Sequence, residues 1–129
     1  MVGRERRATI WDVGHRVLIV DDHPSFRATA RVLLEADGFT VVGEASDGAS
    51  ALTEICRLRP EVVLLDVGLP DLDGFAVCAQ LKQHGAGPAV ILVSSRDLSD
   101  FGSLVSRSGA RGFVPKAELS GERLQALLS

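Results

Sequence analysis

The sequence predicts an α/β domain whose doubly wound, parallel five-stranded sheet has the order 2-1-3-4-5 and is flanked by five helices. Short runs in which every residue is apolar recur along the chain, for example at 17–20, 62–65 and 89–93. Such runs are typical of parallel strands that are buried on both faces. Segments with helical periodicity alternate with them, and crossover helices of this kind make the strands parallel and cover both faces of the sheet.

Each expected strand is a short, largely apolar run. The strands are expected, in chain order, at 16–21, 40–45, 62–66, 89–93 and 111–114. The segments after them carry apolar residues three and four positions apart, as amphipathic helices do. These helices are expected at 24–37, 48–59, 74–84, 97–108 and 118–129. Their sheet-facing residues should include Phe26, Ala30, Leu33, Leu34, Ala49, Leu52, Ile55, Cys56, Phe75, Cys78, Leu81, Leu98, Phe101, Leu104 and Val105.

Proline and glycine residues mark the boundaries of these elements. Pro24 suits the first turn of a helix, and Gly38 suits the end of the same helix. Pro60 stops the second helix because proline lacks the backbone N–H that a helix needs. Breaks at 85–88 and at Gly109 end the third and fourth helices.

The length and composition fit one soluble domain. The chain has 129 residues, of which 46% are hydrophobic and 24% charged, and this length is enough for one core. Residues 1–14 lack a clean period and are expected to form a flexible N-terminal arm that precedes a folded domain at 15–129. Cys56 and Cys78 are expected to be buried thiols, in preference to a disulfide or a metal site.

Charge and hydropathy argue against two classes of partner. The net charge of −3 offers no basic face, so direct binding of this chain to nucleic acid is not expected. No apolar run reaches the roughly 18 residues that span a bilayer, and the arginines at 4–7 are not followed by the apolar segment of a secretory signal. A cytoplasmic location without membrane contact is therefore expected.

Polar residues follow the strands at the points where the apolar runs stop. Asp21 and Asp22 follow the first strand, Asp66 ends the third, Ser94 follows the fourth and Lys116 follows the fifth. In open parallel sheets, ligands bind at the carboxyl ends of the strands, next to the switch point between strands 1 and 3. These side chains are therefore expected to converge in one crevice.

Three acids close together favour a bound cation. Their ligand atoms are all oxygens, which suits a hard divalent ion. Acids at strand ends can also be plain turn residues or helix caps, and for Asp71 and Asp73 that interpretation is the better one. His23 is expected to be an exposed loop residue and not a ligand, because imidazole suits zinc or copper better than magnesium.

Four segments resemble the motifs of a response-regulator receiver domain from bacterial two-component signalling. They lie at 20–24 (VDDHP), 65–70 (LDVGLP), 93–95 (VSS) and 113–116 (FVPK). The resemblance covers about 16–128, and the residues of these segments are most similar to those of receivers that carry a helix-turn-helix output domain. It implies the flavodoxin-like form of the predicted sheet.

The resemblance also implies the metal and its ligands. Asp22 and Asp66, together with the backbone carbonyl of Gly68, would hold Mg²⁺, and Asp21 would act mainly through a water molecule. Mg²⁺ keeps several waters, so few protein ligands suffice.

The remaining site residues receive roles from the same resemblance. Asp66 would be the phosphoacceptor, taking the phosphoryl group from a histidine of a sensor kinase, and Lys116 and Ser94 would contact the phosphoryl oxygens. Ser94 and Phe113 would form the switch that changes the face of helix 4, strand 5 and helix 5, although Phe113 can equally be a plain core aromatic. Such a domain is not a conventional enzyme, because it catalyses only its own phosphoryl transfer and dephosphorylation.

Several alternatives stay open at the level of sequence. The chain is expected to contain no output domain, so it is either a stand-alone receiver that signals to a downstream protein or the N-terminal piece of a DNA-binding regulator. A receiver-like binding module that signals without phosphorylation is a further alternative, and a flavin-binding protein is disfavoured by the acidic loop after strand 1. A homodimer through helices 4 and 5 on activation is plausible by resemblance. The Lys116–Ala117 peptide, which many receivers replace by a cis Lys–Pro bond, is left open.

Overall fold

The computed structural model describes residues 15–85 and 87–129; the N-terminal arm predicted at 1–14 lies outside the described residues. Its strands are β1 (Arg16–Val20), β2 (Thr40–Ala45), β3 (Val62–Asp66), β4 (Ala89–Ser94) and β5 (Gly112–Pro115). Its helices are α1 (Pro24–Ala36), α2 (Gly48–Leu58), α3 (Gly74–Gln83), η1 (Leu98–Phe101), α4 (Leu104–Ser108), η2 (Lys116–Glu118) and α5 (Gly121–Leu128).

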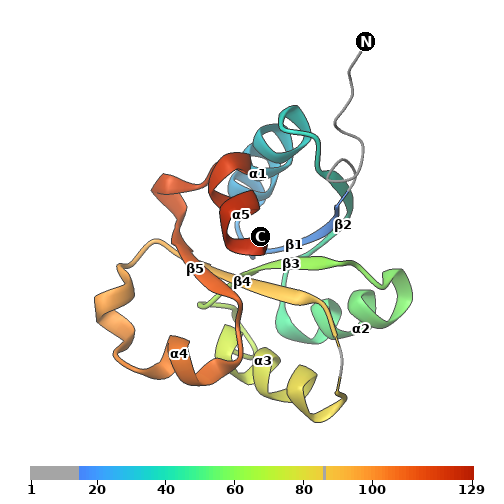
Figure 1. Ribbon diagram of the computed structural model, residues 1–129. Coiled ribbons are helices and arrows are strands. Elements are labelled where there is room, and N and C mark those ends of the chain that lie inside the picture. The colour runs from blue at the N-terminus through green and yellow to red at the C-terminus, as the bar shows by residue number, and fades with distance from the viewer. Residues whose placement is uncertain (1–14, 86) are drawn as a thin grey trace.

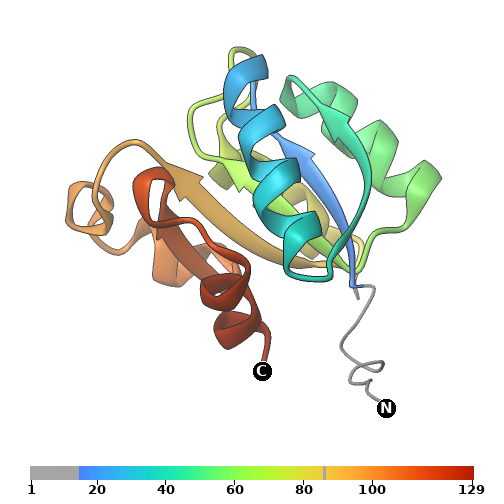
Figure 2. The same cartoon turned by 90° about the horizontal axis from the view of Figure 1, so that it is seen from above.

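The five strands form one parallel sheet in the order β2-β1-β3-β4-β5. The predicted fold class is therefore confirmed. Helices α1 and α5 cover one face of the sheet, and α2, α3 and α4 cover the other (Figure 1). Seen from above, β1 and β4 point toward the same edge of the sheet (Figure 2), as parallel strands must.

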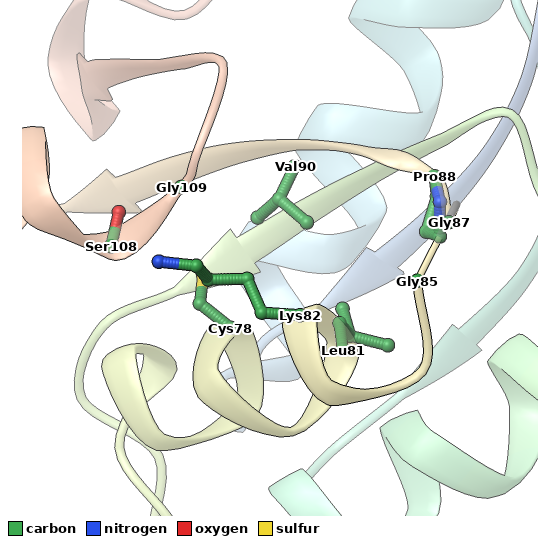
Figure 3. A pocket seen from close by; sticks show the side chains of 9 residues that line it. All are labelled: Cys78, Leu81, Lys82, Gly85, Gly87, Pro88, Val90, Ser108 and Gly109. Atoms are coloured by element: carbon green, nitrogen blue, oxygen red, sulfur yellow. The ribbon is translucent and has the colours of Figure 1, made fainter.

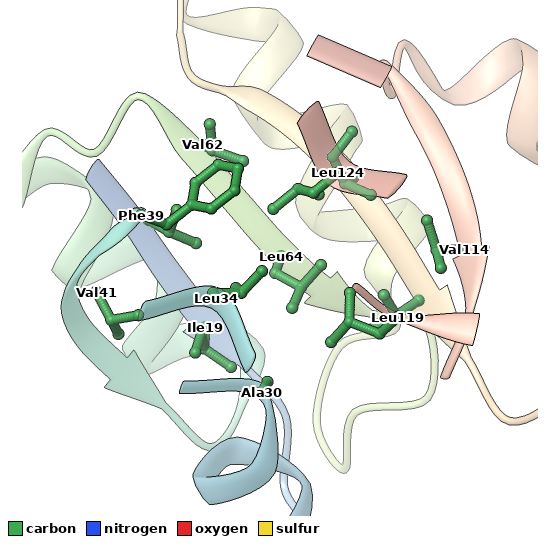
Figure 4. Close-up of a cluster of buried hydrophobic side chains, with 13 residues drawn as sticks. Ile19, Ala30, Leu34, Phe39, Val41, Val62, Leu64, Val114, Leu119 and Leu124 are labelled. Atoms are coloured by element: carbon green, nitrogen blue, oxygen red, sulfur yellow. The ribbon is translucent and has the colours of Figure 1, made fainter. Parts of the chain in front are cut away.

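Alternate strand residues enter two separate cores. On the face of α1 and α5, Ile19 and Leu64 pack with Leu34 (Figure 4). On the opposite face, Leu18 and Leu65 belong to the cluster under α2 and α3. All five side chains are buried. Burial of each such side chain contributes roughly 1.5–3 kcal/mol to stability. Packing on both faces therefore stabilises the central strands and the position of the loops at their carboxyl ends.

The predicted fourth helix at 97–108 is wrong as a continuous element. The chain forms the short 3₁₀ turn η1, which Asp97 and Asp100 close with a reciprocal capping box, and then the five-residue α4. Gly102 lies between them with a φ of 57°, a left-handed conformation that interrupts the helix and that glycine adopts easily.

The last helix begins later than predicted. The segment after β5 forms η2, and α5 starts only at Gly121, where the hydroxyl of Ser120 accepts a hydrogen bond from the Arg123 N–H. The Lys116–Ala117 peptide, left open by the sequence, is trans, like the other peptide bonds of the described residues.

Some residues predicted to face the sheet point to solvent. Leu33, Leu98 and Leu104 are exposed, and so is Cys56, which contradicts its prediction as a buried thiol, whereas Cys78 is buried as expected. Successive helical residues are turned by about 100°, so Leu33 and Cys56 lie just outside the stripes that bury their neighbours. Leu98 and Leu104 were expected to share one face of a continuous fourth helix. Because that helix is interrupted, they do not share a buried face.

Within the described residues, none of the helices combines the length and the apolar character that crossing a bilayer requires.

Candidate functional site

The strand register brings the predicted site residues together. Val20, the last residue of β1, pairs with Leu65, so Asp21 and Asp66 are neighbours across the two central strands. At the other side of β3, Asp66 pairs with Val93, and Ser94 pairs with Pro115, directly before Lys116. The carboxyl ends of β1, β3, β4 and β5 thus meet at the switch point of the sheet, where ligands of such folds bind.

Lys116 lies between two buried acids. Its Nζ is 2.6 Å from Asp21 Oδ2 and 3.4 Å from Asp66 Oδ2. Asp21 is fully buried and Asp66 is 4% exposed, so the ammonium offsets negative charge that water cannot reach. The same ammonium lies 4.6 Å from the ring centroid of Phe26 on α1, which holds it over an aromatic face.

Asp66 is harder to ionise than an ordinary aspartate. Burial is the main cause that raises its pKa, and the nearby Asp21 carboxylate raises it further. The Gly68 N–H, which donates to Asp66 Oδ1 at 3.1 Å, and the Lys116 ammonium act in the opposite direction. Additional positive charge at this position would favour the ionised form.

His23 is exposed, as predicted, but it contacts the two acids beside it. Its backbone N–H donates to Asp21 Oδ1 at 2.8 Å. Its Nδ1 lies 2.9 Å from the same oxygen and 3.1 Å from Asp22 Oδ1. No sequence pattern predicts this contact, because it depends on the geometry of the turn between β1 and α1.

The acids fit a hard divalent cation. Ligand atoms of Asp21, Asp22, His23 and Asp66 all lie within 4.8 Å of one another. The Oδ1 atom of Asp22 is buried and accepts no hydrogen bond of good geometry within the described residues. Carboxylate oxygens are the ligands that Mg²⁺ prefers, so the cluster is compatible with magnesium.

A cavity of about 190 Å³ opens next to Asp66, and Gly68, Ser94 and Lys116 also line it. Ser94 is almost fully buried, and its Oγ accepts a hydrogen bond from the Arg96 N–H at 3.0 Å. The cavity therefore presents an acid, a base and a hydroxyl to one small space.

Phe113 lies on β5, beside the same region. It is partly buried against the core cluster under α3, and its ring centroid is 5.7 Å from that of Phe101 in η1. The Arg96 guanidinium lies 5.5 Å from the Phe101 centroid. Phe113 thus joins the strand end to the segment that carries η1.

Asp71 and Asp73 are helix caps, as predicted. Asp73 caps α3 by accepting a hydrogen bond from the Ala76 N–H. Asp71 accepts hydrogen bonds from the N–H groups of Gly48 and Ala49 at 2.7 and 3.0 Å, and so caps α2 from another loop. Asp71 lies far from the start of α2 in the sequence, so no local motif predicts this second cap.

A second hollow lies at the opposite edge of the sheet. It has a volume of about 120 Å³ and lies between the end of α3, the start of β4 and the end of α4 (Figure 3). Cys78, Lys82 and Ser108 line it. None of the predicted site residues lies there, so the acidic cluster is the better candidate for a functional site.

Sequence comparison agrees with the geometry of the acidic site. The profile of the response regulator receiver domain matches residues 17–129. The chain belongs to this family. The predicted family is thereby confirmed, and the chain is a receiver domain of the kind found in two-component response regulators.

Two curated relatives and one solved structure are similar to this receiver domain. A putative transcriptional regulator of Pseudomonas aeruginosa is 42% identical over 111 residues, which cover 86% of this chain and 54% of that protein. The virulence factors putative positive transcription regulator BvgA of Bordetella pertussis is 40% identical over 112 residues, which cover 87% and 54%. The receiver thus spans about half the length of these relatives.

The solved structure is the signal receiver domain of the putative response regulator NarL from Mycobacterium tuberculosis. It superposes with a TM-score of 0.80 at 34% identity, covering 91% of this chain and 98% of that one. The near-complete coverage of an isolated receiver agrees with the single sheet observed here.

Proposed function

We propose that this receiver accepts a phosphoryl group on Asp66 from a histidine of a sensor kinase. The observation that carries the proposal is the Lys116 ammonium, 3.4 Å from an Asp66 oxygen at the wall of a small cavity. Asp21 is a poorer acceptor because it is fully buried, and other side chains contact both of its oxygens. Asp66 is the acid that both borders the cavity and faces a fixed positive charge.

The transfer exchanges one bond to phosphorus for another. A carboxylate oxygen of Asp66 forms the new O–P bond while the P–N bond to the kinase histidine breaks, and the electron pair of that bond returns to the imidazole. Lys116 provides a point charge for a phosphoryl oxygen, and the Ser94 hydroxyl can donate to another. The protein mainly positions charged groups, as phosphoryl transfer requires.

Asp22, Asp66 and the backbone carbonyl of Gly68 would hold Mg²⁺, with Asp21 beside them. When bound, the cation neutralises charge on the transferring group. The buried Asp22 Oδ1 without a hydrogen bond of good geometry supports this assignment, because such an oxygen is costly unless it has a positive partner. His23 would have to leave its contacts with the two acids or share them.

The signal would leave through the face formed by η1, α4, β5 and α5. Ser94 would turn from the Arg96 N–H toward the phosphoryl group, and Phe113 would move into the space beside β4. This is a shift of population between two packings. The Phe101 ring in contact with Phe113 supports the path, because one ring cannot move far without the other.

Phosphorylation with a small donor tests the proposal. The protein is incubated with acetyl phosphate and Mg²⁺, and intact mass is measured. We expect a mass increase of one phosphoryl group in the wild type and none in Asp66→Asn. Asp73→Asn is the matched control, because it alters a nearby loop acid that caps α3, and it should be phosphorylated like the wild type. Failure of the wild type to react would favour a binding module that signals without phosphorylation.

We also propose that residues 15–129 act as the receiver part of a transcription regulator. The curated relatives are named as transcription regulators and are about twice as long as their matched region. DNA binding would then belong to a fused output domain or to a downstream protein, and a homodimer on activation would assemble it. A second, more basic helical domain encoded directly downstream in the gene would support the fused form; its absence there would favour a separate partner.

A further inference from the structure

One side chain outside the acidic cluster holds the backbone from which two of its acids project. Arg27 lies on the first turns of α1, and its Nη1 donates to the backbone carbonyl of Asp21 at 2.6 Å. That carbonyl and the N–H of Asp22 belong to the same peptide group, so the hydrogen bond fixes the peptide plane directly before Asp22.

The other side of this segment is fixed by the sheet. The Asp21 N–H donates to the carbonyl of Ala45 at the end of β2 at 3.0 Å. After Asp21 the chain has left β1, so no further strand hydrogen bond orients the turn that leads to α1. Within the turn, the His23 N–H donates to Asp21 Oδ1 at 2.8 Å, and Arg27 adds a constraint on the Asp21 carbonyl from the helix side.

Arg27 is itself held in place by an ion pair with Glu44, which also pairs with Arg31. Its Nε donates to Glu44 Oε1 at 2.9 Å, and Arg31 Nε donates to Glu44 Oε2 at 3.0 Å. Arg27 is 19% exposed and Glu44 30%. Burial raises the pKa of Glu44, but the hydrogen bonds and charges of the two arginines outweigh it and lower the pKa overall. Glu44 is therefore an ionised anchor on β2 that holds the Nε side of the Arg27 guanidinium, while Nη1 donates to the Asp21 carbonyl.

We propose that Arg27 is a positioning residue for the cation site and that Glu44 anchors it. This inference rests on the proposed binding of Mg²⁺ by Asp22 and Asp66. The planar guanidinium presents Nε to Glu44 and Nη1 to the Asp21 carbonyl in one fixed geometry, which the single nitrogen of a lysine does not reproduce. Residues behind metal ligands commonly change metal affinity by 10–100-fold when they are replaced.

The direction in which Mg²⁺ affinity changes on removal of Arg27 separates a positioning role from a purely electrostatic one. Arg27 carries a positive charge close to the acids, so its removal should by charge alone strengthen the binding of a cation. Loss of the fixed peptide plane should weaken it instead. Arg31→Met removes an equal charge from the same Glu44 but leaves the hydrogen bond to Asp21 intact, which makes it the matched control.

The test is a Mg²⁺ titration of the whole chain, followed by amide NMR shifts, on the wild type, Arg27→Met, Arg27→Lys and Arg31→Met. We expect Arg27→Met to bind Mg²⁺ roughly tenfold more weakly, with Arg27→Lys intermediate and Arg31→Met within about twofold of the wild type. Without Mg²⁺, the Asp22 amide nitrogen should shift in Arg27→Met and stay in place in Arg31→Met. Circular dichroism confirms that each variant is folded at the temperature used.

Two results would overturn the inference while leaving the magnesium site intact. One is wild-type or stronger affinity in Arg27→Met. The other is an equal loss in Arg31→Met, which would assign the effect to the shared charge network instead of the carbonyl hydrogen bond. If the wild type shows no Mg²⁺-dependent shifts, the proposed cation site itself is overturned, and the role of Arg27 with it.

Discussion

Asp66 combines a reactive position with an unfavourable environment. The side chain is almost fully buried, and a second carboxylate, Asp21, shares the Lys116 ammonium with it. One positive charge therefore faces two acids. Such an arrangement costs stability in the ionised state and makes the site receptive to a cation.

The raised pKa of Asp66 predicts a specific dependence of stability on pH. Burial, with the Asp21 charge, raises the folded-state pKa, so the contribution of Asp66 to stability is present below its unfolded pKa of about 4 and is lost as the pH rises through the folded pKa. In buffer without divalent cations, Asp66→Asn should therefore gain stability over the wild type as the pH rises. Urea unfolding of both proteins between about pH 4 and pH 8 measures the difference in their free energies of unfolding. A difference that shrinks with rising pH would contradict a raised pKa of Asp66.

The two cysteines should differ sharply in reactivity. Burial raises the pKa of the Cys78 thiol to about 11, so little thiolate exists near neutral pH, whereas Cys56 is exposed. In the native protein, a chromogenic disulfide reagent at pH 8 should modify one thiol quickly and the second only after unfolding. Cys56→Ser should remove the fast phase and Cys78→Ser should keep it; the reverse pattern would show that the burial of these residues is wrongly assigned.

At the scale of elements, close contact between α3 and the end of β3 shapes the loop after Asp66. Gly74 is the first residue of α3, and its N–H donates to the Val67 carbonyl at 2.8 Å. A Cβ at this position would lie 2.8 Å from the Asp66 carbonyl oxygen and 3.0 Å from the Val67 Cα. Both neighbours are backbone atoms, which cannot move without displacing Asp66.

Replacement of Gly74 should therefore cost stability through this contact. We expect Gly74→Ala to lower the free energy of unfolding by about 1–3 kcal/mol, the usual range for overpacking, and to slow phosphorylation of Asp66. Gly87→Ala is the control, because a Cβ there meets nothing within 4 Å, and it should be nearly neutral. Chemical denaturation and phosphorylation time courses measure the two effects, and equal stability of the two variants would exclude the close contact as the cause.

At the scale of the molecule, the site lies beside the surface that would report on it, because Phe101 of η1 lines the same cavity as Asp66 and Lys116. The acids and Lys116 lie at the carboxyl edge, whereas η1, α4 and β5 line one side of the domain (Figure 1). Phe113 on β5 contacts Phe101 of η1, and Phe101 contacts Phe75 of α3 at 5.8 Å between centroids. This row of rings links the end of β5 to η1 and α3, so a movement of Phe113 would be felt in the segment that carries η1.

Lys116 should couple the phosphoryl group to that surface. Addition of beryllofluoride and Mg²⁺, as a phosphoryl mimic, should shift the amides of η1, α4 and β5 in the wild type. Lys116→Ala should still show Mg²⁺-dependent shifts near Asp66 but lose the distant ones, because the charge that joins β5 to the acceptor is gone. Amide spectra of both proteins check this, and unchanged distant shifts in Lys116→Ala would place the coupling elsewhere, for example on Ser94 alone.

Local chemistry along the chain was sufficient to predict much of this protein. Apolar runs such as 62–65 indicate the strands, because short strands buried on both faces are apolar at every position. The residues after those runs identify the site, because parallel strands all end at the same edge. The limits of α1, α2 and α3 also follow from proline, glycine and capping residues close by in the sequence.

Other features depend on partners far away in the chain and follow only from the packing of the elements. Gly102 broke the predicted fourth helix, Asp71 capped α2 from another loop, and Cys56 turned outward. Arg27 reached the Asp21 carbonyl only because α1 packs beside the ends of β1 and β2. Apolar period and turn chemistry are local properties that a sequence states directly, whereas the direction of a side chain and the identity of its hydrogen-bond partner are set only when the packed elements bring distant groups within reach.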